Sequence, residues 1–243
     1  MKVLTVDIGN TCIKGSVFEE RKLLESVLLE ERNADELLPL IRKYEPDGAI
    51  SCCVGGNADR FVNELESISG LKVMQFNHAS RLPIEVEYET FRTLGLDRIA
   101  AAVGAATELN NSLVVDAGTA VTLDLVSDKK FLGGNISPGL RLRLRSLNHY
   151  TSRLPLVNPN GETPRFGCST STAIRSGVVN GIVAEICSTY HDADRMYPGI
   201  TLILTGGDAD FLSPMLKQRG LDPQVDHSLV GHGLEQIYKM NIR

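Results

Sequence analysis

The sequence contains no tryptophan, and aromatic residues make up only 5% of the chain. Proteins that hold single-stranded nucleic acids commonly stack the bases on aromatic side chains, so this scarcity argues against nucleic acid as a partner. An excess of positive charge is also missing, because the formal net charge is −5 at pH 7. A general polyanion-binding surface is therefore not expected, although this balance allows one local basic pocket.

Long hydrophobic runs are absent as well. No stretch approaches the roughly 20 apolar residues of a membrane helix, and no charged, then apolar, then cleavable segment opens the sequence, so no membrane partner is expected. The cysteines are odd in number and include no C-x-x-C pair, which favours free thiols in a reducing, cytoplasmic setting. They are Cys12, Cys52, Cys53, Cys168 and Cys187.

What is present is the composition of a soluble globular protein, with 42% hydrophobic and 23% charged residues over 243 positions. Amphipathic segments at 34–44 and 58–69 alternate with apolar segments at 48–54 and 71–76, which predicts an α/β protein with mixed sheets and crossover helices. The pair Asn110–Asn111 separates a small-residue helix from a second strand-rich half. We therefore expect two domains, residues 1–110 and 111–243.

Polar residues cluster on a turn near the start of the chain. Residues 2–18 predict a hairpin, in which a Gly-Asn turn joins two apolar strands. The turn region carries Asp7, Gly9, Asn10, Thr11 and Lys14. Gly9 lets the backbone approach an anion closely, Lys14 supplies a point charge for phosphate, and Asp7 could face a hydrated divalent metal. A solvated polar turn is the alternative interpretation.

The same plan returns half a chain later. Residues 113–124 again give an apolar strand, an Asp-x-Gly motif and a second strand. Asp116 corresponds to Asp7, and Gly118 corresponds to Gly9. Two similar phosphate-type hairpins indicate a duplication that produces two related domains, and the duplication favours the ligand-binding interpretation of the first hairpin.

Two further motifs combine glycine with charged residues. Thr205-Gly206-Gly207-Asp208 follows a predicted strand and precedes a helix, where it could admit an adenine or ribose or form a tight turn capped by aspartate. Gly95-Leu96-Asp97-Arg98 places a carboxylate beside a guanidinium. That pair could handle a hydroxyl and a carboxylate of one small substrate. Alternatively, Asp97 could simply be an N-cap or ion-pair residue of a helix expected from Ile99 to Leu109, with Arg98 on the surface.

Two predicted helices have distinctive surfaces. Arg141, Arg143 and Arg145 alternate on the first, which favours a solvated or interface face over a nucleic-acid site. In the second, expected from Thr172 to Tyr190, small residues recur every fourth position at 173, 177 and 181. A row of small residues permits close backbone approach, so we expect that helix to pack against another at a domain or subunit interface.

Taken together, the motifs resemble the acetate and sugar kinase, actin-like ATPase superfamily, and more closely the type III pantothenate kinases. They occur in the family's order and cover nearly the whole chain. The motifs are Asp7-Ile8-Gly9-Asn10-Thr11 with Lys14, Gly95-Leu96-Asp97-Arg98, Asp116-Ala117-Gly118-Thr119-Ala120, Gly134-Asn135-Ile136-Ser137-Pro138-Gly139, Ser169-Thr170 with Ala173-Ile174, and Thr205-Gly206-Gly207-Asp208.

The resemblance implies a duplicated actin-like (ribonuclease H-like) fold whose halves clasp ATP. It implies ATP-dependent phosphorylation of the 4′-hydroxyl of pantothenate, the first step toward coenzyme A, with Mg²⁺ bridging the phosphates. A homodimer is also implied, and Asp116 would bind a monovalent cation, K⁺ or NH₄⁺. The residues implied to hold the phosphates are Asp7, Ile8, Gly9, Asn10, Thr11, Cys12, Ile13, Lys14 and Thr119.

For the acceptor, the resemblance implies that Asp97 is the catalytic base. The pantothenate contacts would be Tyr88, Gly95, Leu96, Asp97, Arg98 and a threonine at 170 or 172. Two alternatives stay open: another small-molecule kinase of the superfamily, or an ATP-binding regulatory accessory protein without activity. Loss of Asp97 would have favoured the second, and Asp97 is present.

Overall fold

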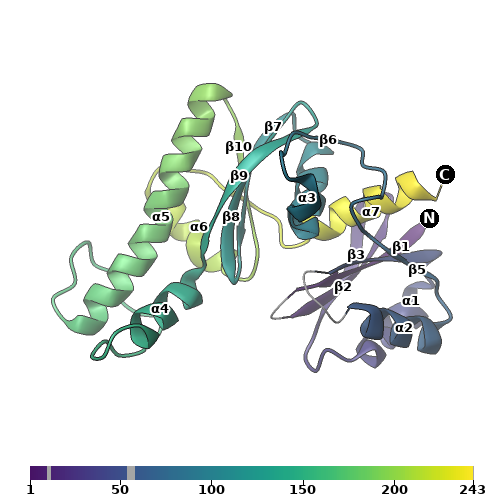
Figure 1. The fold of residues 1–243 in the computed structure, drawn as a ribbon, viewed down its shortest axis with the longest axis horizontal. Helices are drawn as coiled ribbons and strands as arrows, with labels where there is room; N and C mark the ends of the chain where they lie inside the picture. The colour runs from purple at the N-terminus through teal and green to yellow at the C-terminus, as the bar shows by residue number, and fades with distance from the viewer. Residues whose placement is uncertain (10–11, 54–57, 243) are drawn as a thin grey trace. The chain divides into compact units, whose positions relative to one another are not determined.

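The computed structural model describes residues 1–9, 12–53 and 58–242 (Figure 1). Two of the predicted phosphate-site residues, Asn10 and Thr11, lie outside the described residues. The chain forms two compact units. Unit 1 comprises residues 1–110, 126–133 and 228–243, and unit 2 comprises residues 111–125 and 134–227.

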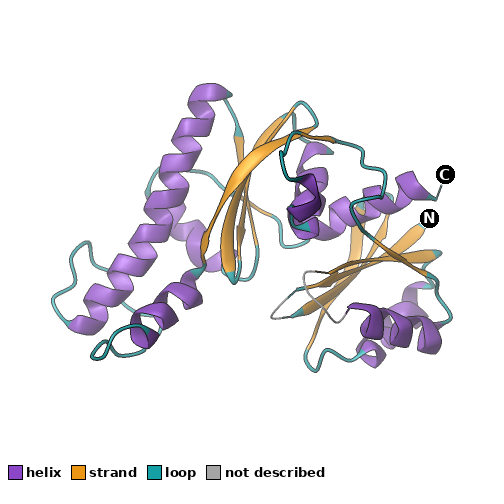
Figure 2. Ribbon diagram, viewed as in Figure 1, coloured by secondary structure: helices purple, strands orange, loops and turns teal. Residues whose placement is uncertain are grey.

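Strands and helices alternate along the chain as the hydrophobic pattern predicts (Figure 2). The strands are β1 (Lys2–Ile8), β2 (Ile13–Glu19), β3 (Lys22–Leu29), β4 (Gly48–Cys53), β5 (Val73–Gln75), β6 (Glu85–Val86), β7 (Asn111–Ala117), β8 (Ala120–Ser127), β9 (Lys130–Pro138), β10 (Thr201–Thr205) and β11 (Gln224–Val225). The helices are η1 (Ala34–Leu37), α1 (Leu38–Tyr44), α2 (Ala58–Ser69), η2 (Phe91–Thr93), α3 (Leu96–Ala106), α4 (Leu140–His149), α5 (Thr170–Met196), α6 (Ala209–Gln218) and α7 (Leu229–Asn241).

The first sheet lies in unit 1 and has the strand order β3-β2-β1-β4-β5. Strands β1, β2 and β3 are antiparallel neighbours, whereas β4 and β5 run parallel to β1. Helices η1, α1 and α2 cover one face, because their apolar side chains share a core with alternate residues of β1 and β2. Strands of period two present every second side chain to that core.

The opposite face of the first sheet is covered by α7, which also packs along α3 (Figure 1). Glu235 of α7 is fully buried there, and its carboxylate accepts hydrogen bonds from the backbone N–H of Arg21 (3.1 Å) and from Lys239 Nζ (2.6 Å). A buried carboxylate is tolerated when it is paired in this way. The last helix, expected with the second domain, therefore packs with the first unit, and the chain returns to it at Ser228.

The second sheet has the order β11-β10-β7-β8-β9-β6. Without the edge strand β6, this is the order of the first sheet, because β7 takes the place of β1 and β10 that of β4. Strands β7 and β10 are parallel, and only two residues, Gly118 and Thr119, join β7 to β8 in a hairpin. The repeated strand order confirms the duplicated fold that the two Asp-x-Gly segments predict.

In unit 2, helices α4, α5 and α6 cover the sheet (Figure 2). Their buried residues share a core with alternate positions of β7 and β8, such as Val115 and Leu123. Helix α5 begins at Thr170 and ends at Met196, which makes it longer than the predicted segment. Ser169 caps it through a reciprocal box with Thr172, and this box explains the earlier start. In the described part of the chain, no helix combines the length and apolarity needed to cross a bilayer.

Candidate functional site

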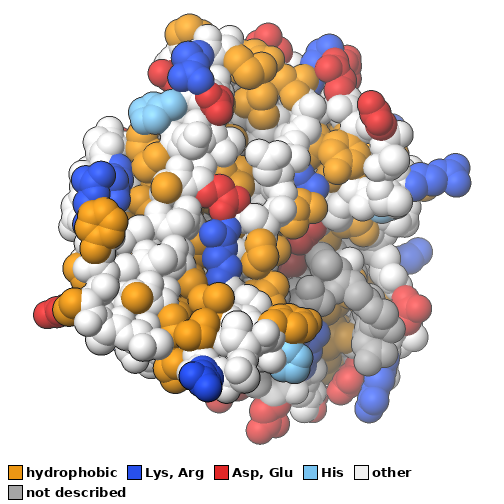
Figure 3. Space-filling view, turned by 60° about the vertical axis from the view of Figure 1, so that its left-hand side comes forward, with side chains coloured by type: hydrophobic (Ala, Val, Ile, Leu, Met, Phe, Trp, Pro, Cys, Tyr) orange, Lys and Arg blue, Asp and Glu red, His pale blue; other side chains and the backbone are white. Residues whose placement is uncertain are grey.

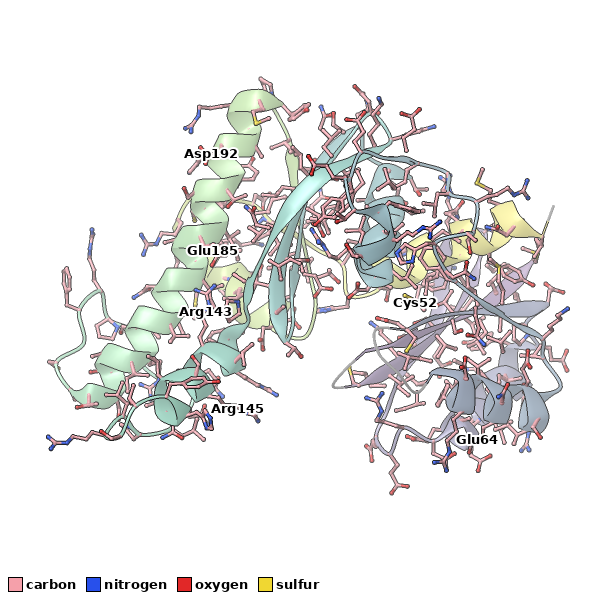
Figure 4. The ribbon with its side chains drawn as sticks, viewed as in Figure 1. Cys52, Glu64, Arg143, Arg145, Glu185 and Asp192 are labelled. Carbon is pink, nitrogen blue, oxygen red and sulfur yellow. The ribbon has the colours of Figure 1, made fainter. Side chains whose placement is uncertain are left out.

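Three side chains of unit 1 line up across neighbouring strands. Asp7 on β1 is in register with Lys14 on β2 and with Cys52 on β4. Residues opposite one another in adjacent strands project to the same face of a sheet, so the carboxylate, the ammonium and the thiol share one face. Figure 4 labels Cys52 on this sheet. The register brings together a predicted phosphate ligand and a predicted metal ligand.

The carboxylate of Asp7 is electrostatically strained. Its pKa is raised from 3.8 to about 6: burial is the largest cause, the nearby charge of Asp97 also raises it, and Lys14 opposes the rise. A like charge close by disfavours ionisation, and an opposite charge favours it. A divalent cation near these carboxylates would oppose both unfavourable effects, so the electrostatics of this site suit a metal ion.

Cys52 is a neighbour that sequence reasoning missed. Its side chain is fully buried, and burial raises the pKa of its thiol well above 9.0, with further contributions from Asp7 and Asp97. The thiol therefore stays neutral and adds no third negative charge beside the two carboxylates. Within the sequence Cys52 belongs to an apolar strand, and only the pairing of β4 with β1 brings it next to Asp7.

The loop between β1 and β2 is closed by a hydrogen bond from Gly9 N to Cys12 O of 3.0 Å. Arg32 Nη1 donates to Gly9 O at 3.1 Å, which brings a second cation to this loop. Ile8 and Ile13 bury their side chains in the core beneath the loop. For these two residues, only the backbone is available to a ligand, whereas Cys12 is exposed.

Asp97 lies in the first turn of α3, which begins at Leu96 rather than at Ile99. Gly95 is the N-cap residue, and Asp97 Oδ1 accepts from the N–H of Arg98 at 2.9 Å. Asp97 is therefore not the N-cap residue of α3. A Cβ at residue 95 would lie 2.5 Å from Asp97 Oδ1, so glycine gives this carboxylate its room.

Arg98 points into an aromatic surround. Its guanidinium carbon lies 5.9 Å from the ring centre of Tyr88 and 5.5 Å from that of Phe131, and the residue is only 6% exposed. The two rings meet edge-on with centroids 5.9 Å apart. Phe131 was not among the predicted site residues, because in the sequence it only opens a returning strand.

In unit 2, Asp116 is the next-to-last residue of β7 and lies opposite Thr205 of β10. Gly206 follows at a φ of +90°, a conformation that other residues adopt at a cost, and a Cβ there would clash with Asp116 Oδ1 and the carbonyl of Ala117. Asp208 donates its backbone N–H to that same carbonyl at 2.9 Å. The structure thus unites the second Asp-x-Gly motif with the glycine pair after β10.

The predicted threonines occupy different surroundings. Thr119 is exposed on the β7–β8 turn, and its carbonyl accepts from Gly139 N at 3.0 Å. Thr172 accepts from Ser169 N at 3.0 Å, so its hydroxyl belongs to the helix cap. Thr170, the first residue of α5, is exposed. Of the two acceptor candidates, Thr170 is the one whose hydroxyl the helix cap does not use.

The arginines of α4 serve different purposes. Arg143 donates to Pro138 O at 2.6 Å and to Ser137 Oγ at 2.9 Å, and it pairs with Glu185 of α5 (Figure 4). Burial raises the pKa of Asp208, and the charge of Arg141 opposes that rise. In the space-filling view of Figure 3, acidic and basic side chains are interspersed. Arg143 thus joins two helices.

Among the described residues, no group of three or more His, Cys, Asp and Glu side chains forms a metal-binding cluster. Mg²⁺ in phosphate-transferring proteins usually binds through one or two carboxylates together with substrate phosphates. The donor set of unit 1, with Asp7 and Asp97 close enough to interact, fits that mode.

Comparisons with known proteins support the same chemistry. The family model described as "Type III pantothenate kinase" matches residues 3–192. The chain belongs to this family. A type III pantothenate kinase from Flavobacterium johnsoniae is 40% identical over 220 residues, which cover 88% of this chain and 89% of that protein. One from Phocaeicola vulgatus is 35% identical and covers 98% of both chains.

Solved structures agree with this family assignment at the level of the fold. A Campylobacter jejuni protein named for the Baf family of transcriptional activators has a TM-score of 0.66 and 26% identity, and 98% of each chain is covered. Component A of the (R)-2-hydroxyglutaryl-CoA dehydratase of Acidaminococcus fermentans has a TM-score of 0.56 at 14% identity, with full coverage of both chains. This member of the type III pantothenate kinase family has the duplicated actin-like ATPase fold.

Proposed function

We propose that the protein transfers the γ-phosphoryl group of ATP to the 4′-hydroxyl of pantothenate, the first step of coenzyme A biosynthesis. The proposal rests on family membership over nearly the whole chain. The observation that carries it is local: in unit 1, the charges of both Lys14 and Asp97 shift the pKa of Asp7. A kinase needs this combination of a cation that binds phosphate, a carboxylate that binds a metal ion, and a base that accepts the proton of the acceptor hydroxyl.

The phosphates are held by the β1–β2 loop, with the backbone from Ile8 to Ile13, the hydroxyl of Thr11 and the ammonium of Lys14 as donors. The resemblance also assigns a phosphate contact to Thr119, on the second hairpin. Backbone N–H groups and one lysine form a common phosphate cradle. Asp7 would hold Mg²⁺, which supplies charge neutralisation on the phosphate oxygens. The raised pKa of Asp7 supports this role, because a bound cation would lower that pKa and stabilise the ionised carboxylate.

Asp97 is the base that receives the proton of the acceptor hydroxyl. Phosphoryl transfer has a loose transition state, so the protein mainly positions groups and balances charge. Asp97 lies in the first turn of α3. It accepts the proton late, as the hydroxyl oxygen bonds to phosphorus, and a weak base is adequate for that step.

Arg98 and Tyr88 contact the carboxylate end of pantothenate, while Gly95 and Leu96 line the acceptor beside Asp97. Arg98 is buried, so an anion that pairs with it is held where water competes little. Of the two threonines that the resemblance implies for the acceptor, we favour Thr170, because the hydroxyl of Thr172 caps α5.

Asp116 binds a monovalent cation, K⁺ or NH₄⁺. Gly206 and the carbonyl of Ala117 crowd its carboxylate, and a Cβ would fill this space. Carboxylate and carbonyl oxygens are the ligands that hard cations prefer. This cation would support the fold of the nucleotide site and takes no part in proton transfer.

The protein works as a homodimer through α5. Its small residues border a groove of about 510 Å³, and the lining residues are Arg165, Phe166, Gly167, Ala173, Ser176, Gly177, Asn180 and Gly181. Phe166 is 84% exposed beside this groove. A partner helix that seats against the groove would cover the exposed ring.

Gly177→Leu tests the dimer. A Cβ at residue 177 meets nothing within 4 Å, so the fold of the single chain should survive and only a partner helix would be displaced. Light scattering should show a dimer for the wild type and a monomer for Gly177→Leu. Gly177→Ala, which adds one methyl group, is the matched control and should weaken the dimer less. A stable Gly177→Leu dimer would exclude this interface.

The activity itself is tested by ADP release. The purified protein is incubated with Mg²⁺, K⁺ and ATP, and pantothenate is compared with a panel of sugars. We expect ADP release that depends on pantothenate and yields phosphopantothenate in equal amount. Turnover of a sugar instead would favour another kinase of the superfamily. ATP binding without turnover of any acceptor would favour a regulatory protein, the kind of function in the name of the Campylobacter jejuni structure.

A further inference from the structure

Phe131 occupies a position that none of the predicted motifs covers. Phe131 is fully buried on β9 and lies opposite Val86 of the parallel strand β6. The backbone N–H of Glu87 donates to Phe131 O at 2.8 Å, so the pairing of β6 with β9 fixes the backbone at Phe131. Residues 126–133, which carry Phe131, belong to unit 1, as Tyr88 and Arg98 do.

Three groups contact one another pairwise: the ring of Phe131, the ring of Tyr88 and the guanidinium of Arg98. Their separations are 5.5 Å from Arg98 to Phe131, 5.9 Å from Arg98 to Tyr88 and 5.9 Å between the two ring centroids. A guanidinium within about 6 Å of a ring centre is attracted by the electron density of the ring face, and this attraction grows when water is excluded. Arg98 and Phe131 are both buried, so the favourable condition holds.

The two rings differ in what they can do for a ligand. Tyr88 is partly exposed and has a hydroxyl that can reach a substrate, whereas Phe131 has no exposed surface. Phe131 therefore cannot contact a substrate directly. Its effect must pass through the residues against which it packs.

We propose that Phe131 is a positioning residue for acceptor recognition: its ring holds the guanidinium of Arg98, and the Tyr88 ring beside it, in the orientation that receives the substrate carboxylate. The inference rests on the proposed function, and it adds a specificity determinant that acts from behind the acceptor site. Because the base Asp97 is a separate side chain, loss of the ring should reduce carboxylate recognition more than it reduces the chemical step.

The test compares two acceptors in two matched variants. Pantothenol has the same 4′-hydroxyl as pantothenate but an alcohol in place of the carboxylate. Phe131→Leu removes the ring and keeps an apolar side chain. Phe18→Leu makes the same change at another fully buried phenylalanine of unit 1, whose ring packs against His232 instead. Thermal midpoints measured on the same samples report the structural cost of each change.

For Phe131→Leu we expect the KM for pantothenate to rise about 3- to 30-fold, the range of one desolvated cation–π contact. The KM for ATP and the kcat/KM for pantothenol should change less than twofold, so the preference for pantothenate over pantothenol should fall. Phe18→Leu should lose comparable thermal stability and keep the preference. Phe131→Tyr keeps an aromatic ring at this position and should therefore keep the preference for pantothenate over pantothenol. If Phe131→Leu does not fold, Phe131→Met makes the same comparison, because methionine fills irregular core space well.

Equal losses for both acceptors in Phe131→Leu would overturn the inference, as would an equal loss of preference in Phe18→Leu. Failure of the proposed function looks different. A wild-type protein that phosphorylates neither acceptor would refute pantothenate kinase activity before any variant is compared, whereas an active wild type with an unchanged preference in Phe131→Leu refutes only the positioning role.

Discussion

The two Asp-x-Gly hairpins share their topology and differ in their electrostatics. Strand β2 carries Lys14 in register with Asp7, whereas β8 contains no lysine or arginine. The first connection, from Gly9 to Cys12, has four residues, and the second, Gly118 and Thr119, has two. A longer loop with a cation suits a polyphosphate, and a short turn with a crowded carboxylate suits a single small cation.

This difference shows how a duplicated framework can divide labour. The strand order is kept in both sheets, because the fold depends on it. The residues around the two aspartates differ, although both aspartates lie near the ends of corresponding strands. Asp7 faces a thiol, an ammonium and a second carboxylate, whereas Asp116 lies against the backbone of the Gly206 turn. The predictions below probe this division, from the largest expected effect to the smallest.

Asp97→Asn should have the largest effect, because the first hairpin has an acceptor base beside it. The change keeps the size of the side chain, and Gly95 remains the N-cap of α3, so the thermal midpoint should move little. General-base catalysis is typically worth about 10²- to 10⁴-fold, and kcat should fall by that factor. ATP binding should survive, because Lys14 is unchanged. A kcat within about threefold of wild type, well below the general-base range, would exclude Asp97 as the base.

Asp7→Asn should make the stability of the protein less dependent on pH. The pKa of Asp7 is raised from 3.8 to about 6, so between these values the folded protein holds a proton that the unfolded chain loses. Wild-type stability therefore falls as pH rises through this window, by at most about 3 kcal/mol at about 1.4 kcal/mol per pKa unit.

Denaturant titrations at pH 4 and pH 7 measure this effect. The free energy of unfolding of Asp7→Asn, relative to that of the wild type, should increase from pH 4 to pH 7. The variant should also lose Mg²⁺-dependent turnover. Asp128→Asn, on an exposed turn, is the matched control. A difference that does not change with pH would mean that Asp7 is not strained by its surroundings.

Lys14→Met should make the charge of the first hairpin more like that of the second, whose strand β8 contains no lysine or arginine. Loss of a charge-assisted contact to phosphate should raise the KM for ATP about 10- to 100-fold, and kcat should change less. The pKa of Asp7 should rise further, because Lys14 lowers it. Lys22→Met, at an exposed position on β3, removes the same charge elsewhere and should leave KM unchanged. Equal effects of the two variants would show that Lys14 acts only through net charge.

Replacement of K⁺ by Na⁺ should have the smallest effect and should act through the second hairpin. K⁺ is the more loosely hydrated ion, so protein oxygens replace its water more easily, and turnover should fall by on the order of tenfold or less in Na⁺. Asp116→Asn should remove this ion preference while the pH dependence that arises from Asp7 remains. Equal turnover in K⁺, Na⁺ and a bulky organic cation would exclude the monovalent site.

Some features of the site were accessible from local pattern. The hairpin of Asp7 and Lys14 follows from two apolar strands around Gly9, and its repeat at Asp116 predicts the duplicated sheets that the structure contains. Asp97 was placed near the start of a helix, with an error of three residues, because Gly95 can cap a helix without a side-chain hydrogen bond. The roles of these residues in catalysis stay predictions that the experiments above address.

By itself, the sequence determined most of the strands and helices and the two Asp-x-Gly motifs, because these depend on neighbours a few residues away. The tertiary structure decided which distant residues meet. Pairing of β4 with β1 puts Cys52 beside Asp7, and pairing of β6 with β9 puts Phe131 near Tyr88. It also returned α7 to the first unit, where Glu235 is buried. Strand register and helix packing are settled by the burial of whole faces, and no local pattern in the chain encodes that choice.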